Sequence, residues 1–430
     1  MPISLLSSFT VLILFGIPIG FVLGLTSLLG FILVDKPIFL TMIPQRFFSS
    51  MDGFVFLALP FFLLAGDVMN RIGLTERLVD FANLFFGRMK GGLAQVNIVT
   101  SIIFGGISGA AMADIAALGS VFIPAMEKEG YDIDFAVAVT VASSIIAPII
   151  PPSIIMIIYG AIMGVSIAGL FAAGIVPGLM IGFSLMIVTR FYAGRRNYPR
   201  HIIPMTAKNV THITARALPA LVLPFIILGG ILGGVVTPTE AAAVAAGYAL
   251  FLGFFVYRNL GLKDLYDLLY KNAMIVGILA VILSGASILA WLLAMQQIPQ
   301  MVAEFILSIT QNKYMVLALI NIFLIFIGMF LDITAALLIL GPILAPLAIS
   351  LGVDPLHFGV MMCINLNIAL MTPPMGACLF MAMIVSTSSS NSVSNMPASP
   401  SSRMRSWLLC SLRGVPCSPS ARSAAMSTER

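Results

Sequence analysis

One apolar stretch, SSIIAPIIPPSIIMIIYG at 143–160, contains three prolines in the middle of what would otherwise be a membrane-spanning helix. Each proline lacks a backbone N–H and clashes with the preceding turn, which costs about 3 kcal/mol inside a helix. Of the 430 residues, 60% are hydrophobic and only 9% are charged, against roughly 25% charged in a soluble domain. Apolar runs long enough to cross a bilayer recur along most of the chain. The sequence therefore predicts an all-α polytopic membrane protein in which this helix is discontinuous.

The flanks of the apolar runs indicate how the chain is oriented. The first run, 3–34, has no Lys or Arg before it and is too long for a signal-peptide core, so we expect a retained first span. The segment 190–216 carries six basic residues and no acidic one. By the positive-inside rule this segment is cytoplasmic; a phosphate-binding patch is the alternative.

The sequence shows no motif typical of an enzyme active site. The four cysteines lack metal-ligand spacing, three histidines occur, and no catalytic Ser-His-Asp set or zinc, phosphate or dinucleotide motif stands in a suitable context. We therefore expect neither an enzyme nor a cofactor.

Two stretches, 113–153 and 331–376, share one pattern. In each, one aspartate precedes a proline by ten residues, and the aspartate of a Gly-x-Asp precedes a Pro-Pro pair by nineteen. These are Asp114 and Asp132 in the first stretch, and Asp332 and Asp354 in the second. Agreement at several spacings indicates an internal duplication.

Each repeat begins with an apolar segment that small residues interrupt, at 96–123 and 315–344. The halves are about 14 residues long, too short to span, with Gly and Asp at the middle. This is typical of a re-entrant hairpin, in which two half-helices meet near the middle of the membrane. Two ordinary spans joined by a turn are the alternative, and would bring Asp114 and Asp332 to the surface.

The number of spans between the two hairpins decides their relative orientation. We count about five: 131–161, 166–189, 216–235, 238–258 and 273–296. An odd number inverts the second repeat relative to the first, as in secondary transporters. Two amphipathic pieces, 74–86 and 262–272, are predicted to be interfacial helices.

These observations predict the following organisation. The N-terminal scaffold spans and an interfacial helix occupy residues 1–90, and the first transport repeat occupies 91–189. The basic loop follows at 190–216, and further scaffold spans with an interfacial helix occupy 216–313. The inverted second repeat occupies 314–385, and a disordered serine-rich tail occupies 386–430. The first repeat divides into a hairpin at 91–128, a broken helix at 131–161 and a span at 166–189. The second divides into a hairpin at 314–350 and a broken helix at 354–385.

Several polar residues within this apolar chain are candidates for function. An aspartate at membrane depth is costly, so Asp114 and Asp332 are functional candidates, although each could simply cap a half-helix. Arg46 could meet an anion or only snorkel to the interface. Glu240 belongs to a capping box, Thr237-Pro238-Thr239-Glu240, and is predicted to be structural.

The breaks also supply ligands for ions. Unwound backbone in a bilayer needs partners, and a sodium ion can satisfy a ring of carbonyl and hydroxyl oxygens. Half-helix N-termini meanwhile favour an anion. Together these features indicate a cation-coupled importer of a carboxylate.

The motifs GGISGAAMADIAALGSVFIPAM, GYDIDFA, IIPPS, VVTPTEAAAV, DPLHFG and TPPMG resemble the large membrane subunit of TRAP (tripartite ATP-independent periplasmic) transporters, the DctM-like family. The resemblance covers roughly residues 1–385. It implies an elevator-type secondary transporter with two re-entrant hairpins in the bacterial inner membrane, driven by sodium. It also implies two partners, a periplasmic solute-binding protein and a small four-span subunit, and a substrate such as a C4-dicarboxylate, a sialic acid or another organic acid.

The resemblance also implies two sodium clusters. One comprises Gly105 and Ser108 of the first hairpin with Ala147, Ile150 and Pro152 of the broken helix; the other comprises Gly328 with Ala369, Thr372 and Met375. The substrate-binding candidates are Arg46, Ser108, Asp114, Ser144, Asp332 and Asn365. The chain departs from the family's pattern at Ala110, where a second serine is frequent, and at Ala369, where glycine is usual.

The C-terminal segment departs further. Fifteen of the residues 386–430 are serine, and no apolar run there is longer than a few residues. The inverted repeat predicts one more span, the partner of 166–189, so we expect a frameshift near 385. Our hypothesis is a sodium-coupled carrier; the alternatives are an ion channel with re-entrant segments and an inactive, truncated transporter subunit.

Overall fold

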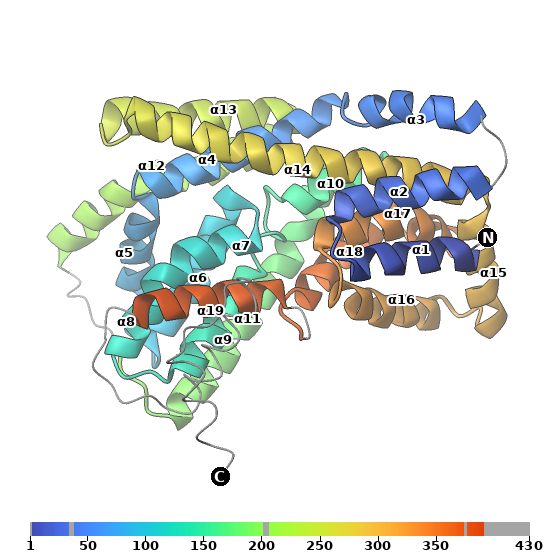
Figure 1. Cartoon of the computed structure of the whole chain (residues 1–430). Coiled ribbons are helices and arrows are strands. Elements are labelled where there is room, and N and C mark those ends of the chain that lie inside the picture. The colour runs from blue at the N-terminus through green and yellow to red at the C-terminus, as the bar shows by residue number, and fades with distance from the viewer. Residues whose placement is uncertain (1, 34–37, 201–205, 374–375, 391–430) are drawn as a thin grey trace, which may run out of the picture. The chain divides into compact units, whose positions relative to one another are not determined.

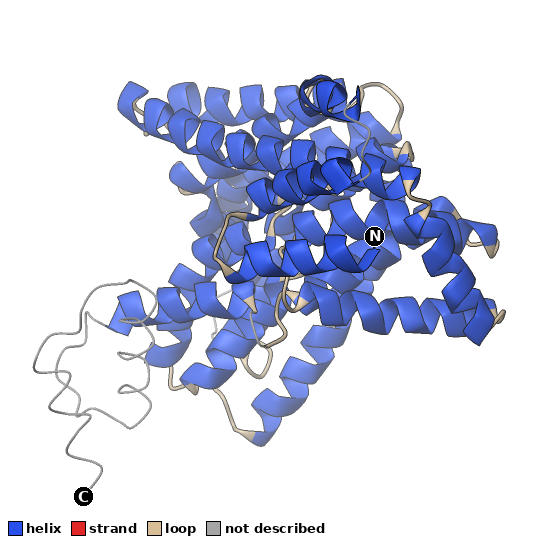
Figure 2. Ribbon diagram, turned by 45° about the vertical axis from the view of Figure 1, so that its right-hand side comes forward, coloured by secondary structure: helices blue, strands red, loops and turns tan. Residues whose placement is uncertain are grey.

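The structure, a computed structural model, describes residues 2–33, 38–200, 206–373 and 376–390. Every regular element in these ranges is a helix (Figure 2). Residues 1–386 form one unit, and the description below concerns that unit. Six helical stretches among the described residues are long and apolar enough to cross a membrane: 54–71, 167–195, 208–232, 238–256, 262–295 and 333–350.

The N-terminal apolar run is two helices and not the single span that we predicted. Helix α1 covers Pro2–Leu14 and α2 covers Ile19–Leu33, and the two pack against each other. Between them Gly16 has a left-handed backbone, with φ of 74°, and Pro18 cannot donate a helical hydrogen bond. The Gly-Ile-Pro tripeptide therefore turns the chain back before a full span is complete.

Two groups of helices make up the predicted scaffold. The first contains α3 (Ile38–Ser49), a 3-10 turn η1 (Phe54–Leu57), α4 (Ala58–Arg71) and α5 (Leu74–Phe86). The second contains α12 (Ala207–Leu232), α13 (Pro238–Phe251) with a π-helical turn η3 (Leu252–Val256), α14 (Leu262–Met295) and α15 (Ile298–Ile309). The two groups pack together, because α13 packs along α4 and α14 contacts both α3 and α4; α14 also packs along α2 (Figure 1).

The predicted capping box at the start of α13 is confirmed. The Thr237 hydroxyl oxygen accepts from the Glu240 backbone N–H, and the Glu240 carboxylate accepts from the Thr237 backbone N–H at 2.8 Å. The Glu240 carboxylate therefore caps the start of its own helix, as predicted.

The prediction of a separate interfacial helix at 262–272 is wrong. These residues are the first third of α14, which continues without interruption into the span. The polar turns are held in the helix by two ion pairs to α4, Arg71–Asp264 and Lys271–Asp67. Since no Gly or Pro separates the amphipathic part from the apolar part, nothing ends the helix between them.

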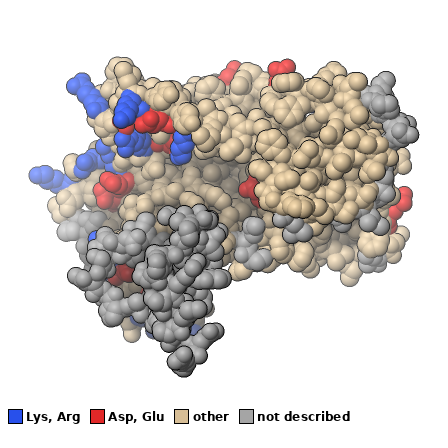
Figure 3. Space-filling model, viewed as in Figure 1, with Lys and Arg blue, Asp and Glu red and all other residues tan. Residues whose placement is uncertain are grey.

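The basic connection after the first repeat is shorter than predicted. Helix α11 extends from Ile167 to Arg195, and α12 begins at Ala207, so both ends of the predicted 190–216 loop are helical. Arg and Lys are good helix formers and their charged ends can reach water from a helix terminus, so basic residues do not by themselves end a span. On the face shown in Figure 3, the Lys and Arg side chains gather at the end where Figure 1 places α5, α12 and α13.

The two predicted repeats contain partly similar elements. The first contains α6 (Gly92–Ser108), α7 (Ala111–Asp114), a π-helical turn η2 (Ile115–Gly119), α8 (Ser120–Lys128), α9 (Ile133–Ser144), α10 (Ile154–Met163) and α11. The second contains α16 (Lys313–Gly328), α17 (Ile333–Ser350), α18 (Pro355–Ala369) and α19 (Ala377–Ser390). Both predicted broken helices are interrupted, between α9 and α10 and between α18 and α19.

Two boundaries in the second repeat differ from our predictions. Helix α17 has 18 residues, enough to cross a membrane by length, whereas we expected a half-helix of about 14. It continues through Pro342 and Pro346 because the sequence around them stays apolar. Helix α19 extends to Ser390, so the first residues of the predicted disordered tail are helical; adding a turn to an existing helix is cheap. The rest of the tail lies outside the described residues.

Candidate functional site

Two residues of the first predicted cluster, Gly105 and Ala147, meet where α6 ends against the break between α9 and α10. Gly105 lies so close to Ala147 that an added methyl group would come 2.7 Å from the Ala147 Cα. The break itself, 145–153, contains a cis peptide bond between Pro151 and Pro152. The structure thus places the end of the first half-helix directly on the unwound backbone.

Several oxygen atoms of the predicted cluster lack hydrogen-bond partners among the described residues. In the described break 145–153, no backbone N–H donates to the carbonyls of Ala147, Ile150 or Pro152. The Ser108 hydroxyl is buried and has no partner among the described residues. The carbonyl of Pro152 lies against Gly109, whose left-handed backbone (φ 61°) allows the close approach. These oxygens match the carbonyl and hydroxyl ligands that a hard monovalent cation prefers, so the residues present fit a sodium ion.

The second predicted cluster repeats the glycine–alanine contact. A methyl group added at Gly328 would come 2.6 Å from the Ala369 Cβ. The Thr372 hydroxyl donates to the Ile368 carbonyl at 3.0 Å, which leaves its oxygen lone pairs as acceptors. Met375 lies outside the described residues. Gly328 at the end of α16 thus meets Ala369 at the end of α18. Thr372 follows in the same turn, its N–H donating to the Ala369 carbonyl at 3.0 Å.

The six substrate-binding candidates do not form one site. Asp114 and Ser144 are fully buried, and Ser108 is nearly so. Asp332 is exposed and caps α17, accepting from the Thr334 backbone N–H at 2.9 Å. The remaining two, Arg46 and Asn365, line two different cavities.

Arg46 lines a cavity of about 560 Å³ between the scaffold and the repeats. Its guanidinium lies 4.9 Å from the centre of the Trp291 ring. Among the described residues that line this cavity Arg46 is the one with a charge, and hydroxyl groups of Ser49, Ser50 and Ser287 accompany it. The opposite wall comes from α10 and α17, through Ala161, Ile162, Leu338 and Pro342. A single cation with hydroxyl donors in a cavity between the two parts suits a small carboxylate.

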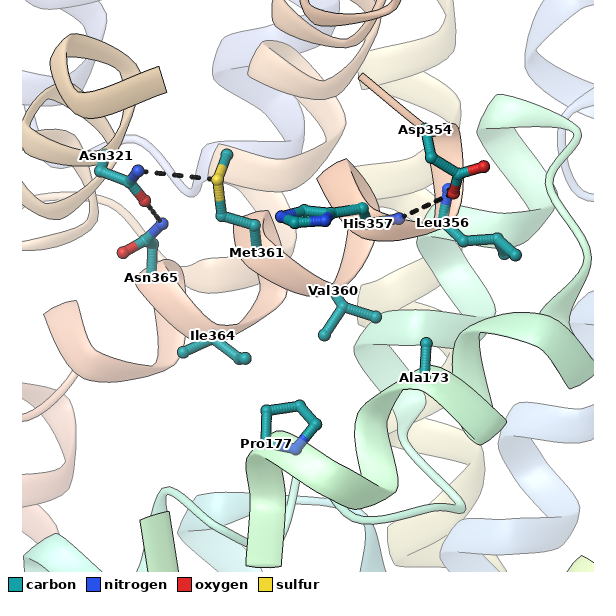
Figure 4. A pocket seen from close by; sticks show the side chains of 10 residues that line it. All are labelled: Ala173, Pro177, Asn321, Asp354, Leu356, His357, Val360, Met361, Ile364 and Asn365. Carbon is teal, nitrogen blue, oxygen red and sulfur yellow. Dashed lines mark hydrogen bonds between the residues drawn. The ribbon is translucent and has the colours of Figure 1, made fainter. Parts of the chain in front are cut away.

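Asn365 lines a second cavity, of about 730 Å³, between α11, α16 and α18 (Figure 4). Its side-chain amide donates to the Oδ1 of Asn321, and Asn321 in turn donates to the Met361 sulfur at 3.6 Å. At the other end of the cavity the Asp354 carboxylate accepts from the Leu356 and His357 backbone N–H groups, as a cap of α18. The lining is otherwise mostly apolar, so besides the amide pair this cavity offers the Asp354 carboxylate, which caps α18, and the His357 ring.

Sequence reasoning missed a polar seam between α6 and α9. The Asn97 amide donates to the Thr140 hydroxyl at 2.8 Å, and one turn further the Ser101 hydroxyl lies 3.1 Å from that of Ser143. Ser101 also donates to Asp114 at 2.9 Å. The signal was present, because Asn97 and Ser101 are four residues apart, as helix neighbours are, in an otherwise apolar stretch.

Comparison with known proteins identifies the family of the chain. The family model described as "Tripartite ATP-independent periplasmic transporter, DctM component" matches residues 6–399. The sialic acid TRAP transporter large permease protein SiaM of Vibrio cholerae is 40% identical over 366 residues, which cover 85% of each chain. The C4-dicarboxylate TRAP transporter large permease protein DctM of Pseudomonas aeruginosa is 38% identical over 364 residues, which cover 84% of each.

A solved structure resembles the fold. The YdaH transporter of Alcanivorax borkumensis superposes with a TM-score of 0.58 over 82% of this chain and 81% of its own, at 14% identity. At that identity the likeness concerns the arrangement of the helices alone.

Proposed function

The chain belongs to the DctM family of TRAP transporters, and is therefore a multi-pass membrane permease subunit and not an enzyme; from this we propose that it imports an organic acid anion, coupled to a sodium gradient. The bacterial inner membrane is its proposed location. A periplasmic solute-binding protein and a small four-span membrane subunit are its proposed partners. The relatives transport sialic acid and C4-dicarboxylates according to their names, and an anion of this kind is the proposed substrate.

One observation supports sodium coupling most strongly. At the first cluster, a buried Ser108 hydroxyl and the carbonyls of Ala147, Ile150 and Pro152 lack hydrogen-bond donors within the described residues. A buried polar group without a partner costs about 1–3 kcal/mol. A sodium ion bound there would give such oxygens a partner. Gly105 permits the close approach of α6 to the unwound backbone at Ala147.

The Arg46 cavity supports an anionic substrate. It lies between scaffold helices α3 and α14 on one side and α10 and α17 on the other. A carboxylate held by Arg46 would touch both parts, so its binding would respond to any movement of the repeats against the scaffold. This is the geometry that an elevator-type carrier needs.

The proposal is tested by uptake into proteoliposomes. The purified chain is reconstituted with the small subunit and the binding protein, and uptake of labelled sialic acid and of labelled succinate is followed under an inward sodium gradient. We expect uptake of one of them, dependent on both sodium and the binding protein. Ser108→Ala should raise the sodium concentration for half-maximal uptake about tenfold, and Arg46→Gln should weaken uptake of the anion without changing the sodium dependence.

Two outcomes would contradict the proposal. Equal uptake under sodium and potassium gradients would remove the sodium coupling. Passive, saturation-free flux of small ions, with no need for the binding protein, would favour the ion-channel alternative.

A further inference from the structure

Asp114 lies at a buried contact of α7 with α6 and α9 that neither proposed sodium cluster uses. Its side chain is completely buried, and its Oδ2 accepts from the Ser101 hydroxyl at 2.9 Å. Its other oxygen, Oδ1, has no partner among the described residues. No lysine, arginine or histidine in the described part of the chain pairs with it.

Further oxygen atoms lie at the same buried contact. The Ser143 hydroxyl of α9 lies 3.1 Å from that of Ser101. One turn before, on the same faces of α6 and α9, Asn97 donates to Thr140, and the amide oxygen of Asn97 is buried and unpartnered. On the remaining side, Cys378 of α19 interacts through its thiol with Ser144 and lies near Asp114. Among the described residues, this buried contact therefore holds unpartnered acceptor oxygens and no basic side chain paired with them.

An ionised carboxylate in this position is not stable by itself. Burial removes its water, and the hydroxyl of Ser101 alone does not replace it. Carboxylates within membrane-spanning regions bind a cation, bind a proton or pair with a base. A base is absent from the described residues around Asp114, which leaves a bound cation or a bound proton.

We propose that Asp114, Ser101 and Ser143 bind a sodium ion of their own, separate from the two clusters at the helix ends. The ligands are two carboxylate oxygens and two hydroxyl oxygens, all hard donors suited to a hard cation. One carboxylate and one monovalent ion cancel in charge, whereas a divalent ion would leave a net charge in an apolar surrounding. The three residues are distinct from those of the first cluster. We expect this site to bind sodium in the absence of the organic acid, the binding protein and the small subunit.

The described residues of the second repeat contain no matching buried aspartate. Asp332 stands at the corresponding place in the sequence pattern but is exposed and caps α17. The proposal therefore predicts an odd number of sodium ions for a chain built from two repeats.

The test is equilibrium binding of ²²Na⁺ to the purified full chain in detergent micelles, without substrate. Asp114→Asn should lower the number of ions bound per chain by one. Asp332→Asn is the matched control, because asparagine caps a helix as well as aspartate does, and the number of bound ions should stay unchanged. Ser101→Ala keeps the carboxylate and should weaken one class of sites about tenfold, which tests the site even if Asp114→Asn folds poorly.

The outcomes separate this proposal from the sodium coupling proposed above. Ser108→Ala should weaken a different class of sites; if it has no effect while Asp114→Asn removes one ion, the first cluster is wrong and the present site stands. If Asp114→Asn and Ser101→Ala both bind like the parent chain, the present site is wrong. An infrared carbonyl band of a protonated carboxyl that disappears in Asp114→Asn would show that Asp114 binds a proton. That result would also overturn the sodium assignment.

Discussion

Asp114 of the first repeat and Asp332 of the second each precede a proline by ten residues, yet their surroundings are opposite. Asp114 is buried against Ser101, whereas Asp332 is exposed and caps α17. The second pair of aspartates also differs in the kind of partner that binds the carboxylate. Asp132 interacts with Arg196 and Tyr198, whereas Asp354 accepts from two backbone N–H groups as the cap of α18.

The backbone contacts of the two repeats, in contrast, are alike. Gly105 touches Ala147 and Gly328 touches Ala369, each at the end of a half-helix against a broken helix. The comparison indicates that the repeats share a packing geometry, while the acidic residues in the second serve its helices and those in the first are engaged by other side chains.

The shared contact gives the largest expected effect. In Gly105→Ala and in Gly328→Ala the new methyl group would lie within 2.7 Å and 2.6 Å of Ala147 and Ala369 atoms, and overpacking of this kind costs about 1–3 kcal/mol. We expect each variant to lower the melting temperature and to reduce sodium-driven uptake at least about tenfold. Differential scanning fluorimetry and the proteoliposome assay measure the two effects.

The control for this prediction is Gly247→Ala in α13. No other atom lies within 4 Å of the added methyl group there, and alanine favours a helix by up to about 1 kcal/mol over glycine. That variant should be as stable as the parent or more so. If Gly105→Ala were harmful and Gly328→Ala harmless, the two repeats would not share the packing argued here.

The caps of the second repeat give the next largest effect. Asp354→Ala and Asp332→Ala each remove a side-chain acceptor at a helix start, which costs about 0.5–2 kcal/mol. Asparagine at either position should retain most of that stability. Denaturant unfolding in micelles measures the difference; equal losses for alanine and asparagine would mean that the negative charge, and not the cap, is what matters.

The sequence predicted the parts of the fold that depend on local chemistry. The capping box at Thr237 and the interruptions before α10 and before α19 follow from proline, which acts within one turn. The helices that sequence reasoning missed or misplaced were decided by weaker local signals or by contacts across the chain. The turn between α1 and α2 depends on one Gly-Ile-Pro tripeptide, and the unbroken α14 depends on ion pairs with α4.

The candidate site was predictable to a similar extent. The glycine and alanine of each cluster were named from motifs, and the structure places them in contact. The seam of Asn97, Thr140, Ser101 and Ser143 was not predicted, since hydroxyl and amide groups in an apolar helix often bond only to their own backbone, and their partners lie on another helix. The exposure of Asp332 likewise depends on tertiary packing and not on spacing.

An amide pair in the second repeat stands where the first has a serine pair. Asn321 and Asn365 join α16 to α18, as Ser101 and Ser143 join α6 to α9. A neutral hydrogen bond contributes about 0.5–1.5 kcal/mol, so a double-mutant cycle of Asn321→Ala and Asn365→Ala should give a coupling free energy of that size. A coupling near zero would show that the pair, which lines the cavity of Figure 4, is free to bind something else.

The smallest expected effect concerns Asp132, in the loop before α9. The Tyr198 hydroxyl, which donates to its carboxylate at 2.6 Å, and the Arg196 guanidinium hold the pKa of Asp132 below its ordinary value of 3.8. Because the folded-state pKa is lowered, the stabilisation is present above the ordinary pKa and is lost as the pH falls through the lowered one. The melting temperature of Asp132→Asn should therefore lie slightly below that of the parent at neutral pH, and the two should converge in acid.

Two further variants assign the cause of that pH dependence. Tyr198→Phe removes the hydrogen bond that lowers the pKa most and should reduce the difference at neutral pH more than Arg196→Gln does. The Arg196 pair is exposed, so 1 M salt should screen its contribution but leave that of Tyr198. A difference between Asp132→Asn and the parent that stays unchanged however far the pH falls below the ordinary pKa of aspartate would contradict an electrostatic origin. It would instead indicate that the aspartate shapes the start of α9, as Asp354 shapes the start of α18, and would remove this difference between the repeats.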